Sequence, residues 1–193
     1  MPITKWFPTK ILCEDFDRRK KEKVNNEMMR VFSKMDMKPL SWSTGLHSLS
    51  TENFKQNLVE EYDMHEFKSI LHEALEKYPD FVHPEALERG YKISESWFTL
   101  TETMQRTDRH SHTLYDLAGV YYVQTNGEDG SIRFTNEGPT SHNWYDDIRE
   151  NNCEYKPKEG RIILFPAWLP HQVGENKTFS KRISFAFNIS FIR

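Results

Sequence analysis

The hydrophobic and polar positions of this chain follow one period before about residue 91 and another after it. In the first part, apolar residues recur at steps of three and four over residues 14–35 and 51–78, which is typical of amphipathic helices. We expect the second helical segment to break near Asp63. It should end before Pro79, because proline has no backbone N–H to donate and clashes with the preceding helical turn.

The other segments of the first part favour extended or irregular structure. Residues 5–13 predict a short strand, and Pro8 favours an edge position because proline cannot donate to a neighbouring strand. Residues 38–50 contain Pro39, Gly45 and several serines and threonines, so they predict a loop.

After residue 91 the pattern is typical of short β-strands. Strands are predicted over residues 92–100, 117–124, 131–134, 161–165, 171–174 and 182–192. Glycine, asparagine and proline lie between them, which predicts an all-β sandwich or barrel. Glu128-Asp129-Gly130 fits a hairpin turn. Residues 136–158 form a long polar insertion, and insertions of that length are often binding loops or lids.

The last predicted strand has the clearest alternation of apolar and polar positions. Its apolar positions are Ile183, Phe185, Phe187, Ile189 and Phe191, and the positions between them are Arg182, Ser184, Ala186, Asn188 and Ser190. Because successive side chains of a strand point to opposite faces, one face is apolar and the other small and polar. An arginine and a serine side by side on the polar face would suit a carboxylate inside the mouth of a barrel.

Length and composition favour one domain with an aromatic core. The chain has 193 residues, and 13% of them are aromatic. We expect a single domain over residues 1–193, in which a helical part (about 14–78) buttresses a mainly β core (about 91–193).

Charge and cysteine content exclude several functional classes. The net charge is -3, which gives no sign of binding to nucleic acid or to a membrane. Cys13 and Cys153 are too few for a disulfide framework, and no apolar run resembles a signal peptide or a membrane span. We therefore expect a cytoplasmic protein.

Three histidines stand beside predicted strands. His110 and His112 are one residue apart just before the strand at 117–124, and in an extended segment residues i and i+2 project to the same face. The two imidazoles could therefore converge on one metal ion. His171 follows another predicted strand and a proline-bounded turn, and Arg182 comes eleven positions later.

This set of residues resembles the signature of the Fe(II)/2-oxoglutarate-dependent oxygenases, and in particular a subgroup of small 2OG-Fe(II) oxygenases with a His-x-His element. The matching positions are Trp97, His110-x-His112, Gly119 to Val123, Gly160-Arg161 to Pro166, His171 and Arg182-Ile183-Ser184. The resemblance covers roughly the second half of the chain. It implies a double-stranded β-helix, which is the jelly roll of cupin-like proteins, and an enzyme that uses Fe(II), 2-oxoglutarate and O2.

The resemblance also implies roles for single residues. The three histidines would be the catalytic metal ligands. Arg182 would bind the distal carboxylate of 2-oxoglutarate through a bidentate pair, and Ser184 would add a hydroxyl hydrogen bond. Tyr121 and Tyr122 point to opposite faces of their strand, and the resemblance assigns Tyr122 to the same carboxylate. Trp97 would belong to the core near the site.

The sequence departs from the wider superfamily at His112, where the usual His-x-Asp or His-x-Glu order has a carboxylate. Three ligand sets therefore remain open. The site contains three histidines, or Asp116 supplies a carboxylate beside His112 if the intervening chain folds back, or Asp108 pairs with His110 in the reversed order. All three sets include His171.

The first functional hypothesis is an Fe(II)- and 2-oxoglutarate-dependent oxygenase that hydroxylates an unidentified substrate and releases succinate and CO2. A second is a cupin-like three-histidine dioxygenase or isomerase that does not use 2-oxoglutarate, which would leave Arg182 without a purpose. Three histidines can also hold Zn²⁺ with an open position. A third hypothesis is a binding module that kept the barrel and lost turnover.

Overall fold

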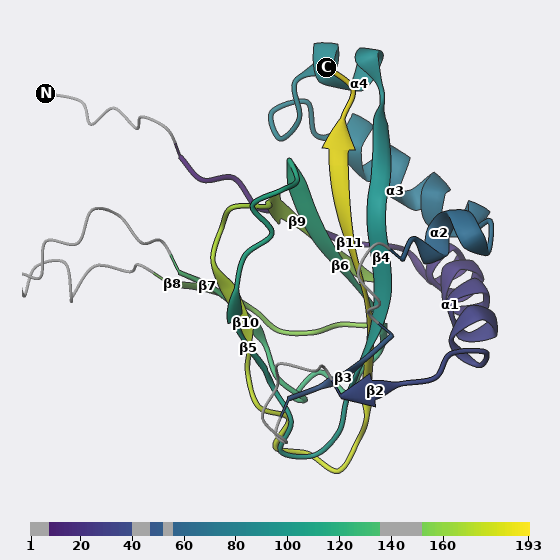
Figure 1. Cartoon of the computed structure of the whole chain (residues 1–193), viewed down its shortest axis with the longest axis vertical. Helices are drawn as coiled ribbons and strands as arrows, with labels where there is room; N and C mark the ends of the chain where they lie inside the picture. The colour runs from purple at the N-terminus through teal and green to yellow at the C-terminus, as the bar shows by residue number, and fades with distance from the viewer. Residues whose placement is uncertain (1–7, 40–46, 52–55, 136–151) are drawn as a thin grey trace, which may run out of the picture.

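The computed structural model describes residues 8–39, 47–51, 56–135 and 152–193, and these residues form two antiparallel β-sheets and several helices (Figure 1). The larger sheet has the strand order β1-β9-β6-β11-β4-β3-β2, and the smaller sheet has the order β5-β10-β7-β8. In chain order the strands are β1 (Leu12–Asp15), β2 (Lys38–Pro39), β3 (Leu49–Ser50), β4 (Tyr91–Thr101), β5 (Thr107–His110), β6 (Leu117–Gln124), β7 (Ile132–Thr135), β8 (Asn152–Tyr155), β9 (Arg161–Pro166), β10 (His171–Val173) and β11 (Arg182–Phe191). The predicted mainly β core with buttressing helices is confirmed.

The helices pack against the outer face of the larger sheet (Figure 1). They are α1 (Arg18–Phe32), α2 (Leu58–Glu61), α3 (His65–Lys77) and α4 (Pro84–Arg89). The side chain of Asp17 caps α1 by accepting a hydrogen bond of 3.0 Å from the backbone N–H of Lys20. The predicted break at Asp63 is confirmed, because this residue separates α2 from α3 with a φ of 46°. Within the described residues, no helix is both long and apolar enough to cross a bilayer.

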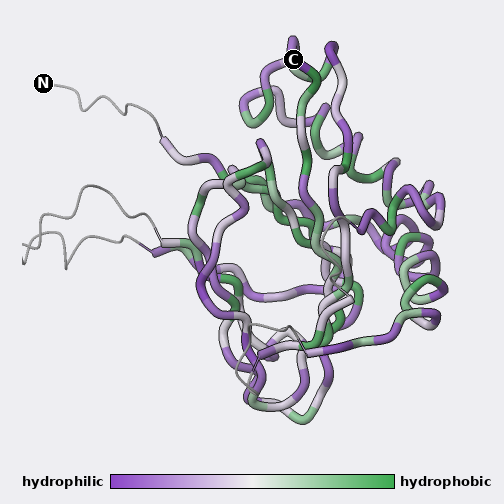
Figure 2. Tube along the Cα trace, viewed as in Figure 1, coloured by the Kyte–Doolittle hydropathy of each residue, from purple (hydrophilic) through white to green (hydrophobic). Residues whose placement is uncertain are grey.

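The alternation along β11 divides the molecule into two apolar clusters. Its apolar face lies under the helices, where the ring of Phe67 on α3 meets Phe185 and Phe187 edge-on at centroid distances of 5.1 and 5.0 Å. Figure 2 shows hydrophobic residues along the strands that lie under the helices. A second cluster, which includes Tyr122 and Phe165, fills the space between the two sheets. The polar face of β11 therefore points into that interior.

Two sequence predictions about β-structure in the core need correction. The first strand begins at Leu12, so residues 8–11 lie outside it, although β1 does occupy the predicted edge position beside β9. The turn at Glu128-Asp129-Gly130 does not close a hairpin, because β6 pairs with β9 and β11 whereas β7 pairs with β10 and β8. The local sequence favours a chain reversal there, but it does not specify the strand with which the chain then pairs.

Other elements were not predicted at all. The predicted loop at residues 38–50 contains β2 and β3, which extend the larger sheet beyond β4. Strand β8 lies inside the predicted insertion at 136–158, of which 136–151 fall outside the described residues. Strand β5 and helix α4 were also missed. These elements are short, so each carries too few residues to display a hydrophobic period.

Candidate metal and co-substrate site

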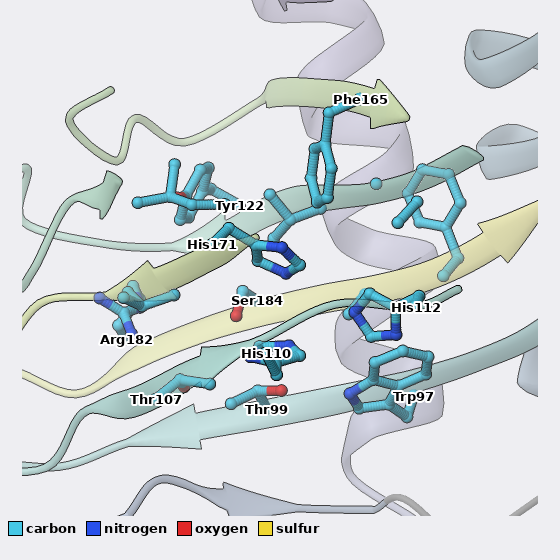
Figure 3. Close-up of a pocket in the computed structure, with 17 residues that line it drawn as sticks. Trp97, Thr99, Thr107, His110, His112, Tyr122, Phe165, His171, Arg182 and Ser184 are labelled. Atoms are coloured by element: carbon cyan, nitrogen blue, oxygen red, sulfur yellow. The ribbon is translucent and has the colours of Figure 1, made fainter. Parts of the chain in front are cut away.

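Three histidines converge between the sheets (Figure 3). His110 ends β5 and His171 begins β10, and the two residues are directly paired in the register of the smaller sheet. Their ring centroids are 4.3 Å apart, and the ring of His112 lies 4.9 Å from that of His110 and 5.3 Å from that of His171. One ring nitrogen of each histidine lies within 4.8 Å of those of the other two. This spacing suits one metal ion.

The convergence arises differently from the sequence prediction. His112 does not continue the strand of His110, because β5 ends at His110 and the chain then turns toward β6. The position of His112 is fixed by its backbone N–H, which donates to the carbonyl of Ala167 at 2.7 Å. The backbone N–H of Ala167 donates in turn to the carbonyl of Asp116 at 3.1 Å. The turn after β9 therefore orients the third histidine.

Backbone contacts also fix which nitrogen each imidazole presents. Nδ1 of His110 lies 2.8 Å from the carbonyl oxygen of Asp108, and Nδ1 of His171 lies 3.0 Å from that of Leu169. A carbonyl oxygen can only accept a hydrogen bond, so both Nδ1 atoms carry the proton. Nε2 of each ring is then left with its lone pair, which is the state a metal requires.

Burial keeps the three imidazoles neutral at neutral pH. It lowers the pKa of His110, that of His112 to about 4 and that of His171 to about 3, and the other histidines of the cluster add to the shifts of His112 and His171. A charged imidazolium cannot bind a metal ion. The low pKa values therefore make the lone pairs available.

The two carboxylates proposed as alternative ligands are engaged elsewhere. Oδ2 of Asp116 accepts a hydrogen bond of 2.8 Å from the backbone N–H of Phe191. Oδ1 of Asp108 pairs with Nε of Arg106 at 2.9 Å, and only the backbone carbonyl of Asp108 reaches His110. Of the ligand sets that the sequence left open, the described residues bring together the three histidines.

The guanidinium of Arg182 lines the same cavity and is only 1% exposed. Its Nη1 donates to the carbonyl oxygens of Asp129 and Gly130 at 2.6 and 2.7 Å, and its Nη2 donates to the hydroxyl of Thr101 at 2.8 Å. Its Nε is buried without a partner among the described residues. Burial lowers the pKa of Arg182, while Tyr122 and Asp129 act in the opposite direction.

The cavity is therefore lined by a buried cation that has one donor, Nε, without a partner among the described residues. Arg182 forms no ion pair within the part of the chain that the structure describes. A buried charge without a counter-charge is costly, and an anionic ligand would remove that cost. The free Nε–H and the second N–H of Nη2 suit a carboxylate.

The remaining residues of the resemblance lie around this cavity. Ser184 and Tyr122 both line it, and burial raises the pKa of Tyr122 to about 12, so its hydroxyl keeps its proton and can donate. Tyr121 faces the helices instead and donates to Oδ1 of Asn25 at 2.8 Å. Trp97 also lines the cavity, with its ring centroid 5.8 Å from that of His112 (Figure 3).

Sequence reasoning missed the residues that hold Arg182 in place. Thr101 lies directly opposite Arg182 on β4. The carbonyls of Asp129 and Gly130 come from the turn that joins the two sheets, and the carboxylate of Asp129 rigidifies this turn by accepting from the Thr125 hydroxyl at 2.6 Å and the Asn126 N–H at 3.0 Å. Every residue has a backbone carbonyl, so the sequence does not indicate which carbonyls accept from Arg182. The register of β4 and β11 could have indicated Thr101.

Comparisons with known proteins agree with this geometry. Residues 95–188 match the family model described as "Putative 2OG-Fe(II) oxygenase". The resemblance to the 2OG-Fe(II) oxygenases is confirmed. The matched segment of this oxygenase-like chain runs from β4 to β11 and contains all three histidines and Arg182. A comparison with curated proteins found no match.

Solved structures of 2OG-Fe(II) oxygenases share the fold of this chain. A carbocyclase, SnoK from nogalamycin biosynthesis, superposes with a TM-score of 0.63 at 10% identity, over 94% of this chain and 79% of that one. A prolyl-4-hydroxylase from Pseudomonas putida gives 0.60 at 13% identity, over 96% and 93%. HygX from Streptomyces hygroscopicus, solved with nickel and 2-oxoglutarate, gives 0.59 at 13% identity, over 94% and 83%. The predicted double-stranded β-helix is therefore confirmed.

Proposed function

We propose that this protein is an Fe(II)- and 2-oxoglutarate-dependent oxygenase whose ligands are His110, His112 and His171. The observation that carries the proposal is the partnerless Nε of buried Arg182 in the cavity that contains three neutral histidines. A metal-only enzyme would give Arg182 no ligand. A co-substrate with a metal-chelating end and a distal carboxylate, as in 2-oxoglutarate, uses both features.

The residues fit the metal and the co-substrate on chemical grounds. The three imidazoles of His110, His112 and His171 would hold the ion and leave other coordination positions open, as non-haem iron oxygenases require. When bound, Fe(II) supplies the activation of O2 that is coupled to the oxidative decarboxylation of 2-oxoglutarate. Because no ligand is a carboxylate, the three histidines do not reduce the charge of a divalent ion. The site would therefore attract the dianionic co-substrate more strongly than a site with two histidines and an acid.

The other residues of the site would bind and orient 2-oxoglutarate. Arg182 would pair with the distal carboxylate of 2-oxoglutarate, and the hydroxyls of Ser184 and Tyr122 would donate to the same group. Phe165 packs against the ring of His171 at 4.6 Å and excludes water from that side. Exclusion of water on that side would strengthen each electrostatic contact with the co-substrate.

We propose hydroxylation as the reaction. The substrate exchanges a C–H bond for a C–OH bond, one atom of O2 enters the product, and the other enters succinate as 2-oxoglutarate loses CO2. The chain could carry out a different oxidation with the same apparatus, since similar folds support a carbocyclase and a hydroxylase. Product analysis by mass spectrometry would distinguish these outcomes by a gain of one oxygen or a loss of two hydrogens.

The first test is an anaerobic titration of the purified protein with Fe(II) and 2-oxoglutarate, read by the visible metal-to-ligand charge-transfer band. We expect a band in the wild type, none in His171→Ala, and none in Arg182→Ala at 2-oxoglutarate concentrations that saturate the wild type. The control variant His65→Ala removes a histidine that is exposed on α3 and should keep the band. Iron binding without a band would favour the cupin-like enzyme, and absence of iron binding would contradict the metal site.

A further inference from the structure

A second polar cluster lies at the other end of the strand face that carries Arg182. Glu95, Tyr115 and Asn188 form it. The Nδ2 of Asn188 donates to Oε2 of Glu95 at 3.1 Å, and Glu95 lies close enough to Tyr115 to add to the rise in the pKa of its hydroxyl, which burial mainly causes. None of these residues has a role in holding the metal or 2-oxoglutarate in the function proposed above.

Glu95 and Asn188 lie on the same faces of β4 and β11 as residues that line the cavity, but one step further along each strand and outside its lining. Asn188 shares the polar face of β11 with Ser184 and Ala186, both of which line the cavity. Glu95 is directly opposite Asn188 on β4, and two residues from Trp97, which lies beside His112. At the rise of a β-strand, Asn188 stands about 7 Å beyond Ala186. The cluster is therefore on the side of the histidines away from Arg182.

Hydrogen-bond acceptors outnumber donors in this cluster. Asn188 is fully buried, yet its Oδ1 has no partner within the described part of the chain. The amide cannot simply be turned over, because its oxygen would then face the carboxylate of Glu95. Glu95 is partly exposed and has no ion-pair partner among the described residues. A buried acceptor without a donor is costly. An additional hydrogen-bond donor beside Glu95 and Asn188 would therefore be favourable.

We propose that Glu95, oriented by Asn188, binds a positively charged N–H group of the substrate, such as an amine or a guanidine. The inference rests on the proposed function and names its substrate class. The substrate would place its charged nitrogen at Glu95 and extend past Trp97, so that the carbon to be oxidised lies near the histidines. Opposite charges on the two sides of the histidines would also keep 2-oxoglutarate on the Arg182 side, because Glu95 repels carboxylates.

The test measures binding of n-butylammonium and n-butanol, two probes of the same length, to the 2-oxoglutarate-saturated protein by ligand-observed NMR. We expect n-butylammonium to bind at least about tenfold more tightly than n-butanol, because a charge-assisted hydrogen bond adds that much. In Glu95→Gln, which removes the charge and keeps the shape, the ratio should fall close to one. Glu102→Gln removes a charge beyond the opposite end of β4, where Glu102 pairs with Lys181, and should keep the preference.

Three results would contradict the proposed amine-binding role of Glu95. A ratio near one in the wild type, no binding of either probe, or a preference that survives in Glu95→Gln would overturn it. Thermal melting of each variant establishes that the protein is folded. The charge-transfer titration of the wild type is read separately. A band without an amine preference would reject the inference and leave the proposed function standing. An amine preference without a band would reject the proposed function and leave only a cation-binding site at Glu95.

Discussion

The guanidinium of Arg182 is oriented by the protein before any ligand arrives. Two backbone carbonyls occupy Nη1, so the edge that bears Nε is the one left for a carboxylate. Such preorganisation lowers the entropy lost on binding, because the longest side chain of the site is already immobilised. The hydroxyls beside it are shorter and contribute through single hydrogen bonds.

The two adjacent tyrosines of β6 provide a matched pair of substitutions. We expect Tyr122→Phe to weaken 2-oxoglutarate binding by about tenfold, because a hydrogen bond to a charged group is lost. Tyr121→Phe removes the bond to Asn25 on the helix side and should instead lower the free energy of unfolding by about 1 kcal/mol. Titration of the charge-transfer band and urea unfolding would separate the two effects. Equal affinities of both variants for 2-oxoglutarate would contradict the placement of Tyr122.

The edge strand β1 is held to the larger sheet by one ionic cluster as well as by its ladder. Asp15 receives hydrogen bonds from Nε and Nη2 of Arg161 at 2.6 and 2.9 Å and from Nζ of Lys158 at 2.7 Å. The bond from Arg161 is the largest cause that lowers the pKa of Asp15 from 3.8 to about 2. As an edge strand, β1 pairs with β9 alone among the described strands.

Stability should therefore depend on the ionisation of Asp15. A carboxylate whose pKa is lower in the folded state stabilises the protein above its unfolded pKa and loses this effect as pH falls. We expect Asp15→Asn to lower the free energy of unfolding by about 1 kcal/mol at pH 7, a modest value because the pair is partly exposed and screened by solvent. The difference should shrink as the pH falls from about 4 towards 2.

Urea unfolding of both proteins across this pH range would measure the effect. Glu22→Gln, which breaks the exposed pair with Arg18 on α1, serves as the control and should leave stability unchanged at each pH. A gap between wild type and Asp15→Asn that stays constant with pH would show that the lost contact is not electrostatic.

Helices and strands with a strong hydrophobic period could be predicted from the sequence, whereas the pairing of strands could not. The alternation from Ile183 to Phe191 predicted both the strand and its two faces, because a buried face imposes a period of two. The turn residues at 128–130 predict a hairpin, and this prediction is wrong. Local turn chemistry carries no information on a partner strand about 40 residues away, such as β10 for β7. The same limit hid Thr101 and Glu95, whose roles come from their register with β11. The histidines were found through the resemblance to the family signature, whereas the strand geometry expected for His110 and His112 is wrong, because β5 ends at His110.

The site lies between the two sheets, so its ligands connect the halves of the molecule. His110 and His171 belong to the smaller sheet, whereas Arg182, Ser184 and Tyr122 belong to the larger one. A metal ion held by the histidines, together with a co-substrate held by Arg182, would link the sheets across the interior. Ligands that bind only the folded state stabilise it in proportion to their concentration relative to Kd.

Thermal unfolding tests this linkage on the whole molecule. With Ni²⁺ as a redox-inactive substitute, we expect the metal alone at 100 times its Kd to raise Tm by about 5–10 °C, from about 2.7 kcal/mol of linkage in a chain of this size. 2-Oxoglutarate added to the nickel-loaded protein should raise Tm further, and the same co-substrate without metal should raise it less. Arg182→Ala should keep the increment from nickel and lose the increment from 2-oxoglutarate, because only the second ligand reaches the larger sheet through that side chain. Loss of both increments in a folded Arg182→Ala protein would mean that the arginine supports the metal site itself, and retention of both would place 2-oxoglutarate away from it.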